Sequence, residues 1–117
     1  MAKLTTHVLN LAAGIPAAGM RIELHSISGD SRTLAASVVT NTDGRSPNAL
    51  LQGDAFCAGR YSLTFHVAAY FRSLGVVLAD PPFLDQVVIA FGVAETQQNY
   101  HVPLLISPWS YSTYRGS

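Results

Sequence analysis

The sequence predicts an all-β fold, a β-sandwich of seven to eight short strands with one short helix. The main observation is an alternation of apolar and polar residues with a period of two, which is typical of half-buried strands. Turn residues, chiefly Gly, Pro, Asn and Asp, separate the alternating segments. With 117 residues, the chain can bury a core but has no room for a second one, so we expect one domain over residues 1–117.

Charge and composition exclude several classes of protein. The chain has 7 basic and 7 acidic residues, and its charged fraction is 12%, about half the usual quarter. A neutral chain is not steered to nucleic acid or to an anionic membrane. The apolar runs also fall well short of the roughly 20 residues of a membrane-spanning helix. Because 49% of the residues are hydrophobic, we expect exposed apolar surface and an oligomer.

The cellular compartment is indicated by the cysteine count and the two ends of the chain. The single cysteine, Cys57, cannot form an internal disulfide. The first residues lack the basic and apolar regions of a secretory signal. The ending Arg115-Gly116-Ser117 differs from the Ser-Lys-Leu type of peroxisomal address. We therefore expect a cytoplasmic protein.

Three strands are expected in the first part of the chain. They cover residues 3–11, 20–27 and 32–40, with turns at 13–16 and 28–31 between them. Alternation along the first strand puts Thr5, His7 and Leu9 on one face and Leu4, Thr6 and Val8 on the other.

The middle of the chain is less regular. The third strand ends at a turn that contains Asp43-Gly44, and Arg45 leaves this turn. Residues 46–59 contain Pro and Gly among small residues, so we expect a loop with at most a short edge strand near Leu50. A strand over residues 60–67 follows.

A short helix is expected next, over residues 68–74, because Ala, Leu and Arg favour helices and Gly75 is a common helix end. Asp80-Pro81-Pro82 excludes regular structure. The strand expected at residues 86–93 is strongly apolar, which indicates burial on both sides or against a partner.

The last eighteen residues predict two strands joined by a tight turn. Apolar and polar residues alternate from Tyr100 to Ile106, the pattern breaks at Ser107-Pro108, and it resumes over residues 109–114. Chain ends usually fray unless they are tied down. Here the final four residues follow a strand directly, so we expect them to be held on a sheet.

Four segments together resemble one family, the transthyretin-like 5-hydroxyisourate hydrolases. They are Leu4-Thr-Thr-His7-Val-Leu, Thr42-Asp-Gly-Arg45, His101-Val-Pro-Leu-Leu-Ile-Ser-Pro and the terminal Tyr114-Arg115-Gly116-Ser117. The resemblance spans essentially the whole chain. Its most specific part is the terminal tetrapeptide, because it separates the hydrolases from transthyretin, the hormone carrier on the same fold.

Two positions depart from the commonest family pattern. Trp109-Ser110 stands where an aromatic-Gly pair is usual, and Asn10 stands where Asp is common. Both lie in a turn or the first strand, so we expect local changes in geometry and no loss of the site.

The resemblance implies a fold, an activity and an assembly. The fold would be a transthyretin-like sandwich. The activity would be hydrolysis of 5-hydroxyisourate, the unstable product of urate oxidation, to the ureidoimidazoline that precedes allantoin, with no cofactor. The assembly would be a homotetramer, a pair of dimers with the sites in the channel where the dimers face each other.

The resemblance also implies the site residues. It makes His7, Arg45 and His101 catalytic, and it adds Tyr114 and Ser117 to His7 and Arg45 as substrate-binding residues. A neutral imidazole can take a proton from water at physiological pH, so one of the two histidines would be the general base and the other would relay a proton to the leaving ring nitrogen. Arg45 would orient the substrate and stabilise the oxyanion. Which histidine is the base stays open.

Other chemistries have weaker support in the sequence. His25 and His66 belong to no matching motif and are expected to be surface or structural residues. Cys57 has no basic neighbour before Arg60 to lower its thiol pKa, and free cysteines are usually buried. No carboxylate or cysteine lies at short ligand spacing from the candidate histidines, so we expect no metal site.

Two further functions compete with hydrolysis. One is a transthyretin-like carrier with an apolar channel for a small aromatic ligand, but a channel lined by two histidines and an arginine would be too polar for it. The other is a structural or adhesion sandwich without a ligand.

Overall fold

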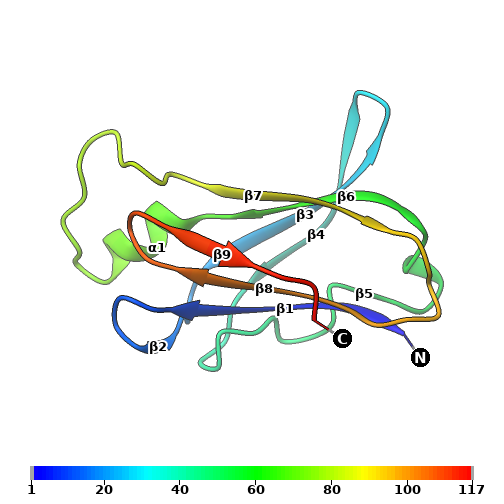
Figure 1. The fold of residues 1–117 in the computed structure, drawn as a ribbon, viewed down its shortest axis with the longest axis horizontal. Helices are drawn as coiled ribbons and strands as arrows, with labels where there is room; N and C mark the ends of the chain where they lie inside the picture. The colour runs from blue at the N-terminus through cyan, green and yellow to red at the C-terminus, as the bar shows by residue number, and fades with distance from the viewer. Residues whose placement is uncertain (1, 117) are drawn as a thin grey trace.

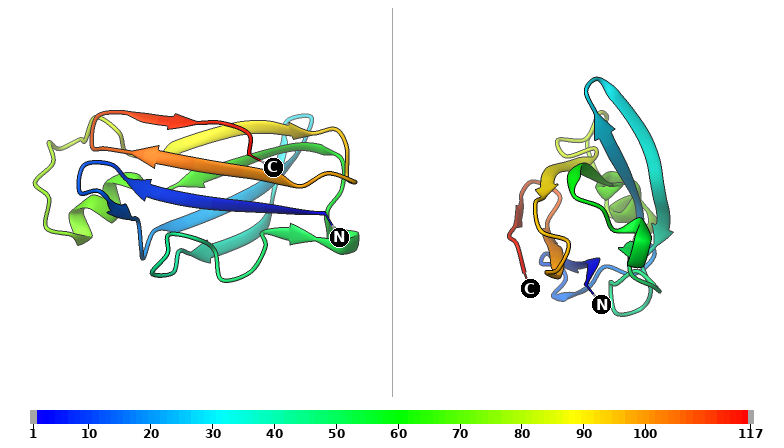
Figure 2. Two further views of the ribbon diagram at one scale, coloured as in Figure 1. Left: turned by 60° about the horizontal axis from the view of Figure 1, so that its bottom comes forward. Right: turned by 90° about the vertical axis from the view of Figure 1, so that its right-hand side faces the viewer.

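The computed structural model describes residues 2–116, and it has two β-sheets packed face to face (Figure 1). The strands are β1 (Lys3–Asn10), β2 (Ile15–Pro16), β3 (Arg21–Ser28), β4 (Ser31–Val39), β5 (Leu51–Gln52), β6 (Gly59–Phe65), β7 (Val87–Val93), β8 (Tyr100–Ile106) and β9 (Tyr111–Thr113). One sheet has the order β2-β1-β8-β9, with β5 also paired to β1, and the other has the order β4-β3-β6-β7. An end-on view separates the two layers (Figure 2).

The all-β class and the single short α-helix are confirmed. The helix α1 (Val67–Ser73) follows β6, and a 3-10 turn, η1 (Gly53–Ala55), follows β5. The described residues contain nine strands rather than seven or eight. The ninth arises because Ile15–Pro16, expected to be only a turn, folds back to pair with Leu9 and Asn10 of β1.

The core lies between the sheets and uses one face of each central strand. On β1 the buried residues alternate as predicted, with Leu4 and Val8 fully inside. The other layer contributes Ile22 and Leu24 of β3 and Phe65 of β6, all fully buried. Each such side chain stabilises the fold by about 1.5–3 kcal/mol relative to exposure. The opposite face of β1 is thereby left free for polar side chains.

Burial of β7 differs from the sequence prediction. The strand was expected to be buried on both sides or against a partner, yet its side chains alternate: Val87 and Val93 are buried, whereas Val88 is 52% exposed. The reason is topological, because β7 is an edge strand whose outer face has no covering layer in one chain. Burial on both sides is therefore wrong for the single chain, and a partner for this face stays a prediction.

The end of the chain is tied down as predicted. Ser107 and Ser110 close the turn between β8 and β9, with the Ser107 amide donating to the Ser110 carbonyl at 2.9 Å. The last strand is shorter than expected, because Trp109 and Ser110 lie in that turn. Beyond β9, Gly116 returns to β8 and pairs with His101.

Within residues 2–116, neither helical segment has the length and apolar character that crossing a membrane would require.

Candidate active site

The two candidate histidines lie on neighbouring strands of one sheet. Strands β1 and β8 pair in parallel, with Thr5 opposite His101 and His7 opposite Pro103. Residues directly opposite one another point to the same side of a sheet, and so do residues two apart on one strand. Thr5, His7 and His101 therefore share a face, the one opposite the core. The two strands that carry these residues thus lie side by side.

Arg45 reaches the same place through a tight turn. The Asn41 side-chain oxygen Oδ1 accepts hydrogen bonds from the amides of Asp43 (3.0 Å) and Arg45 (3.1 Å), which fixes the turn. The Gly44 carbonyl then accepts the Val8 amide of β1 at 2.8 Å. These bonds set Arg45 directly opposite His7 in an antiparallel bridge.

Only glycine fits at position 44. Its φ is +77°, in the left-handed region. An added Cβ would lie 2.3 Å from the Val8 carbonyl oxygen, a distance that two non-bonded atoms cannot adopt. The close approach of this turn to β1 therefore depends on the absence of a side chain.

His7 is oriented by the same turn. Its Nε2 atom lies 2.8 Å from the Asp43 carbonyl oxygen. Because a carbonyl oxygen only accepts, Nε2 must carry the hydrogen. In the neutral imidazole of His7, the basic nitrogen is consequently Nδ1.

His101 is partly buried and contacts two neighbours. Its Nδ1 atom lies 2.8 Å from the Thr5 hydroxyl. Its backbone exchanges hydrogen bonds with Gly116, of which the Gly116 amide to the His101 carbonyl is the shorter at 2.7 Å. Burial lowers the pKa of His101, and the positive charges of Arg45 and His7 lower it further. The imidazole is therefore kept neutral at physiological pH.

A polar cavity opens beside these residues. Its volume is about 560 Å³, within the usual range for small-molecule sites. Arg45 and His101 line it, together with Lys3, Thr5, Ser46, Asn48 and Gln52. His7 does not line the cavity, but its backbone pairs with that of Arg45, which does.

Tyr114 lies apart from the cavity. Its side chain is 62% exposed and lines a second, apolar hollow of about 240 Å³ with Ile89 of β7 and Tyr100. The structure therefore does not bring Tyr114 to the other candidate residues within one chain. Ser117, the remaining candidate, lies outside the described residues.

Within residues 2–116, Arg115 contacts an aromatic ring, a side-chain amide oxygen and a backbone carbonyl. Its guanidinium lies over the Tyr100 ring, 4.1 Å from the ring centre, and Nη2 donates to Gln98 Oε1 at 3.0 Å. This cation–π contact ties the terminal segment to the start of β8. Arg115 thus has a structural role, and Arg45 is the arginine that lines the cavity.

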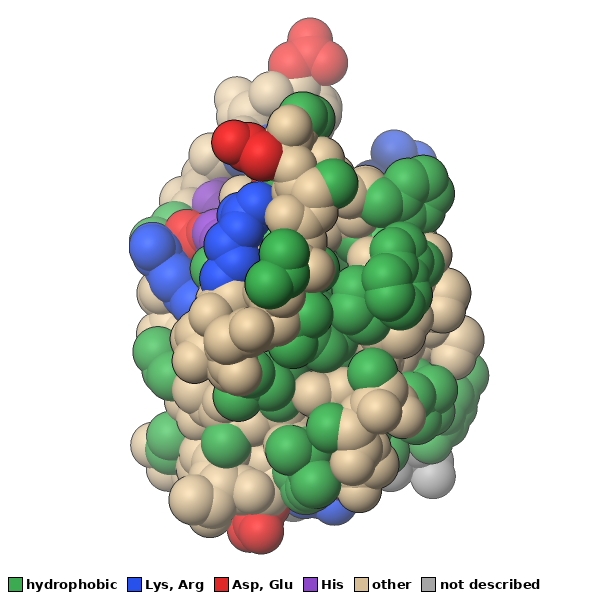
Figure 3. Space-filling view, turned by 90° about the vertical axis from the view of Figure 1, so that its left-hand side faces the viewer, with side chains coloured by type: hydrophobic (Ala, Val, Ile, Leu, Met, Phe, Trp, Pro, Cys, Tyr) green, Lys and Arg blue, Asp and Glu red, His purple; other side chains and the backbone are tan. Residues whose placement is uncertain are grey.

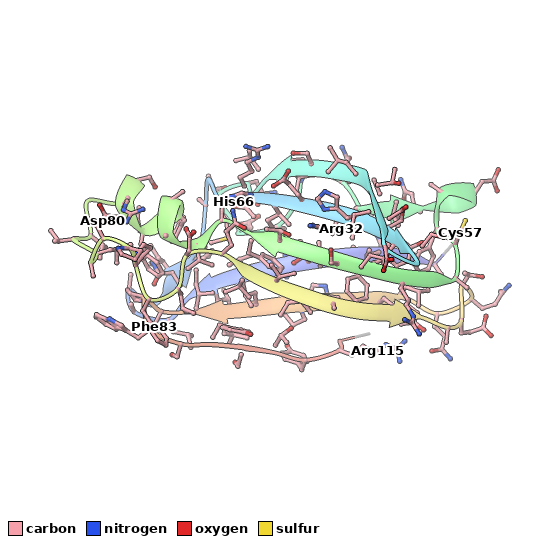
Figure 4. The ribbon with its side chains drawn as sticks, turned by 90° about the horizontal axis from the view of Figure 1, so that it is seen from above. Arg32, Cys57, His66, Asp80, Phe83 and Arg115 are labelled. Atoms are coloured by element: carbon pink, nitrogen blue, oxygen red, sulfur yellow. The ribbon has the colours of Figure 1, made fainter. Side chains whose placement is uncertain are left out.

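His66 lies between β6 and α1 and Arg32 lies on β4, both away from the terminal segment that carries Arg115 (Figure 4). The His66 Nε2 atom is 2.6 Å from Glu23 Oε1, and this hydrogen bond is the main cause of the lowered pKa of Glu23. His25 lies 3.3 Å from an Arg32 nitrogen. The expected structural roles of both histidines fit these contacts.

Cys57 is exposed, contrary to the expectation of a buried thiol. It lies in the connection after η1, where its Sγ donates to the Asp54 carbonyl at 3.4 Å, so no strand carries it into the core. Within residues 2–116, no three His, Cys, Asp or Glu side chains are placed together so that they could hold a metal ion.

Sequence reasoning missed Thr5 and Gly116 as residues around His101. Thr5 carried a usable signal, because it lies two positions before His7 on the same face of β1. Gly116 belonged to the quoted tetrapeptide, but its contact with His101 depends on pairing between distant segments and had no local signal.

Comparison with known proteins gives the family. The model of the HIUase/Transthyretin family matches residues 4–116. The chain belongs to this family. Among curated relatives, 5-hydroxyisourate hydrolase 2 of Rhizobium meliloti is 53% identical over 98% of this chain and 96% of its own length.

Solved structures of HIUase/Transthyretin relatives agree with the fold. The 5-hydroxyisourate hydrolase of Klebsiella pneumoniae is 34% identical with a TM-score of 0.82, and the match covers both chains fully. An (S)-allantoin synthase is 45% identical with a TM-score of 0.94, but the match covers 99% of this chain and only 44% of that one. Sea bream transthyretin, solved with thyroxine, is 28% identical with a TM-score of 0.87 over 98% of this chain and 95% of its own.

Proposed function

We propose that this protein is a 5-hydroxyisourate hydrolase. It would open the six-membered ring of 5-hydroxyisourate at an acyl C–N bond to give 2-oxo-4-hydroxy-4-carboxy-5-ureidoimidazoline, in the degradation of urate to allantoin. The observation that carries the proposal is the meeting of His7, Arg45 and His101 on one sheet face beside a polar cavity. The relatives named 5-hydroxyisourate hydrolase, 53% and 34% identical, support it.

The three residues supply what this hydrolysis requires. A water oxygen bonds to a ring carbonyl carbon while one imidazole takes the water proton. Negative charge develops on the carbonyl oxygen, and the Arg45 guanidinium stabilises it through charge-assisted hydrogen bonds. The C–N bond then breaks and the ring nitrogen receives a proton. His7 and His101 share the two proton transfers, and no covalent intermediate with the protein forms.

Tyr114 and Ser117 would contact the substrate ring in a site shared between chains. Tyr114 is exposed and does not line the cavity of its own chain, which is the arrangement expected of a residue that completes a site only after assembly. The C-terminal residues Tyr114 and Ser117 of one chain would thus complete a site formed with another chain.

The assembly we propose is a homotetramer of single-domain chains, residues 1–117, in the cytoplasm. Large apolar side chains remain exposed, among them Leu11, Val88, Trp109 and Tyr111. Apolar groups also cover much of the end of the sandwich that carries α1 and the loop after it (Figure 3). Patches of this kind usually mark interfaces. Light scattering should give the mass of four chains, and a fully active monomer would contradict the proposal.

The rival function is a carrier like transthyretin. Sea bream transthyretin, solved with thyroxine, shares the fold. The cavity described above, however, is lined by Lys3, Arg45 and His101, and a cationic and polar lining does not suit a largely apolar ligand. This lining favours hydrolysis of a carbonyl-rich heterocycle.

One assay tests the proposed function. Urate oxidase generates 5-hydroxyisourate, and its ultraviolet decay is followed with and without the protein. We expect faster decay with the protein, and His7→Ala and His101→Ala should each lower turnover by roughly 10²–10⁴-fold, as is typical of acid–base groups. An unchanged decay rate, with tight binding of thyroxine instead, would favour the carrier.

A further inference from the structure

The His101 imidazole is held from two sides. The Thr5 hydroxyl lies 2.8 Å from Nδ1. On the other side, a Cβ built on Gly116 would lie 2.9 Å from Cδ2 of the ring, so the Gly116 backbone packs directly against that edge. Nδ1 and Cδ2 are the two ring atoms nearest the strand. The two distal atoms, Cε1 and Nε2, lie farther from the strand, on a side chain that lines the cavity.

His7 is held differently. Its Nε2 hydrogen is committed to the Asp43 carbonyl, and the residue does not line the cavity. Within residues 2–116, His101 is therefore the histidine that lines the cavity and whose distal nitrogen makes no hydrogen bond. The role of this nitrogen depends on whether it carries the hydrogen, and the partner of Nδ1 decides that.

We propose that Thr5 is a positioning residue for the hydrolysis, and that its hydroxyl accepts the Nδ1 hydrogen of His101 so that the lone pair of Nε2 faces the cavity and takes the proton of the attacking water. His101 is then the general base. The proposal rests on the proposed function, because a base at this position has a purpose only in the hydrolysis. Thr5 itself does not touch the reacting atoms.

The protonation steps are consistent with this arrangement. When Nε2 takes the water proton, His101 becomes cationic and its Nδ1–H bond to the Thr5 hydroxyl becomes charge-assisted. A neutral hydroxyl stabilises this cation less than a carboxylate would. The proton then passes, with His7 as the relay, to the leaving ring nitrogen, which restores the neutral imidazole of His101.

The surroundings keep the base in its working form. Burial and the nearby charges of Arg45 and His7 lower the pKa of His101, so the imidazole is unprotonated at neutral pH. A neutral ring with its hydrogen on Nδ1 has only Nε2 available as an acceptor. Thr5 therefore sets the tautomer of His101, while burial and the neighbouring charges set its protonation state.

Three variants test the proposal. Thr5→Val removes the hydroxyl with almost no change of shape and keeps a β-branched side chain on the strand. Thr5→Ser retains a hydroxyl. Thr113→Val is the matched control, because the Thr113 hydroxyl also bonds to β8, at the Pro103 carbonyl at 2.7 Å, and is not bonded to a histidine.

The first readout is the tautomer of His101, measured without substrate by nitrogen-15 NMR of the imidazole in the full protein. We expect the hydrogen on Nδ1 in the wild type, Thr5→Ser and Thr113→Val, and a shift of population to Nε2 in Thr5→Val. A wild type with the hydrogen on Nε2, or an unchanged tautomer in Thr5→Val, would overturn the proposal whether or not the protein hydrolyses 5-hydroxyisourate.

The second readout is turnover of 5-hydroxyisourate. Thr5→Val should lower kcat about 10–100-fold, the size known for residues that orient metal-bound histidines, with little change of KM, while Thr5→Ser and Thr113→Val stay near the wild type. A changed tautomer with wild-type kcat would overturn the role of Thr5 in the reaction. An inactive wild type would overturn the proposed function instead.

Discussion

His7 and His101 lie on one face of neighbouring parallel strands, with His101 opposite Thr5 and His7 opposite Pro103. This register puts two imidazoles and the Arg45 guanidinium close enough for their charges to interact. The pKa of His101 is lowered by burial first, then by Arg45, then by His7. Close like charges do not favour double protonation. The arrangement therefore favours a neutral His101.

The first prediction follows from the charge of Arg45. Arg45→Gln removes a cation that lowers the pKa of His101, so that pKa should rise towards its ordinary value near 6.5. In the wild type, whose pKa is lower, the acid limb of kcat/KM should lie below pH 6.5. An NMR titration of the imidazole measures the pKa directly. A titration of Arg45→Gln that coincides with the wild type would contradict the assigned coupling.

The second prediction concerns the shape of the Arg45 side chain. Arg45→Ala should cost on the order of 10²–10³ in kcat, the size typical of losing an oxyanion donor. Arg45→Lys keeps the charge but loses the planar fork that holds two substrate oxygens at once. We expect it to be nearly as damaging as Arg45→Ala in the ultraviolet assay. Full activity of Arg45→Lys would mean that the site needs only a point charge.

Strand positions and the faces of β1 and β3 were predictable from the sequence. An alternation such as Ile22 and Leu24 against Arg21, Glu23 and His25 reflects local burial, which is a property of single strands. The parallel pairing of β1 with β8 joins residues 96 positions apart, and no local pattern carries that information. Only the family resemblance predicted that His7 and His101 belong to one site.

The remaining differences also arise from contacts between distant segments. Arg115 packs on the Tyr100 ring, a contact that becomes possible only because the terminal segment pairs with β8. Tyr114 was expected at the site, but within one chain it follows β9 and lines a different hollow, so its place at the site stays a prediction. Cys57 is exposed because its loop lies outside both sheets. Composition and alternation say nothing about such placements.

The third prediction concerns the turn that carries Arg45. Gly44 and Gly14 both have left-handed backbones, with φ of +77° and +70°, so alanine at either position should cost about 1–2 kcal/mol of backbone strain. Only at Gly44 would the new Cβ also meet another atom, the Val8 carbonyl oxygen. Gly44→Ala should therefore have the lower urea midpoint and also lose activity, with Gly14→Ala as the control. Equal midpoints would contradict the assigned contact.

The fourth prediction is that hydrolysis needs no added metal. The assigned chemistry uses two imidazoles and a guanidinium, which together supply the base and the cation without a Lewis acid. The purified protein should keep its full rate of 5-hydroxyisourate decay in the presence of a chelator. Loss of activity on chelation, with recovery on adding zinc, would contradict the mechanism.

The fifth prediction concerns the end of the chain. Gly116 pairs with His101 through the backbone and packs against its ring, and an added Cβ would lie 2.9 Å from Cδ2. Gly116→Ala should therefore displace the imidazole and lower kcat, and deletion of residues 114–117 should abolish most activity with little loss of core.

Arg115→Gln is the control, since it removes the contact with Tyr100 but keeps the Gly116 pairing, and its kcat should stay near the wild type. Turnover measures the activity of the three variants, and circular dichroism shows whether they are folded. A folded deletion variant with normal turnover would show that the tetrapeptide marks the family but has no role in the reaction.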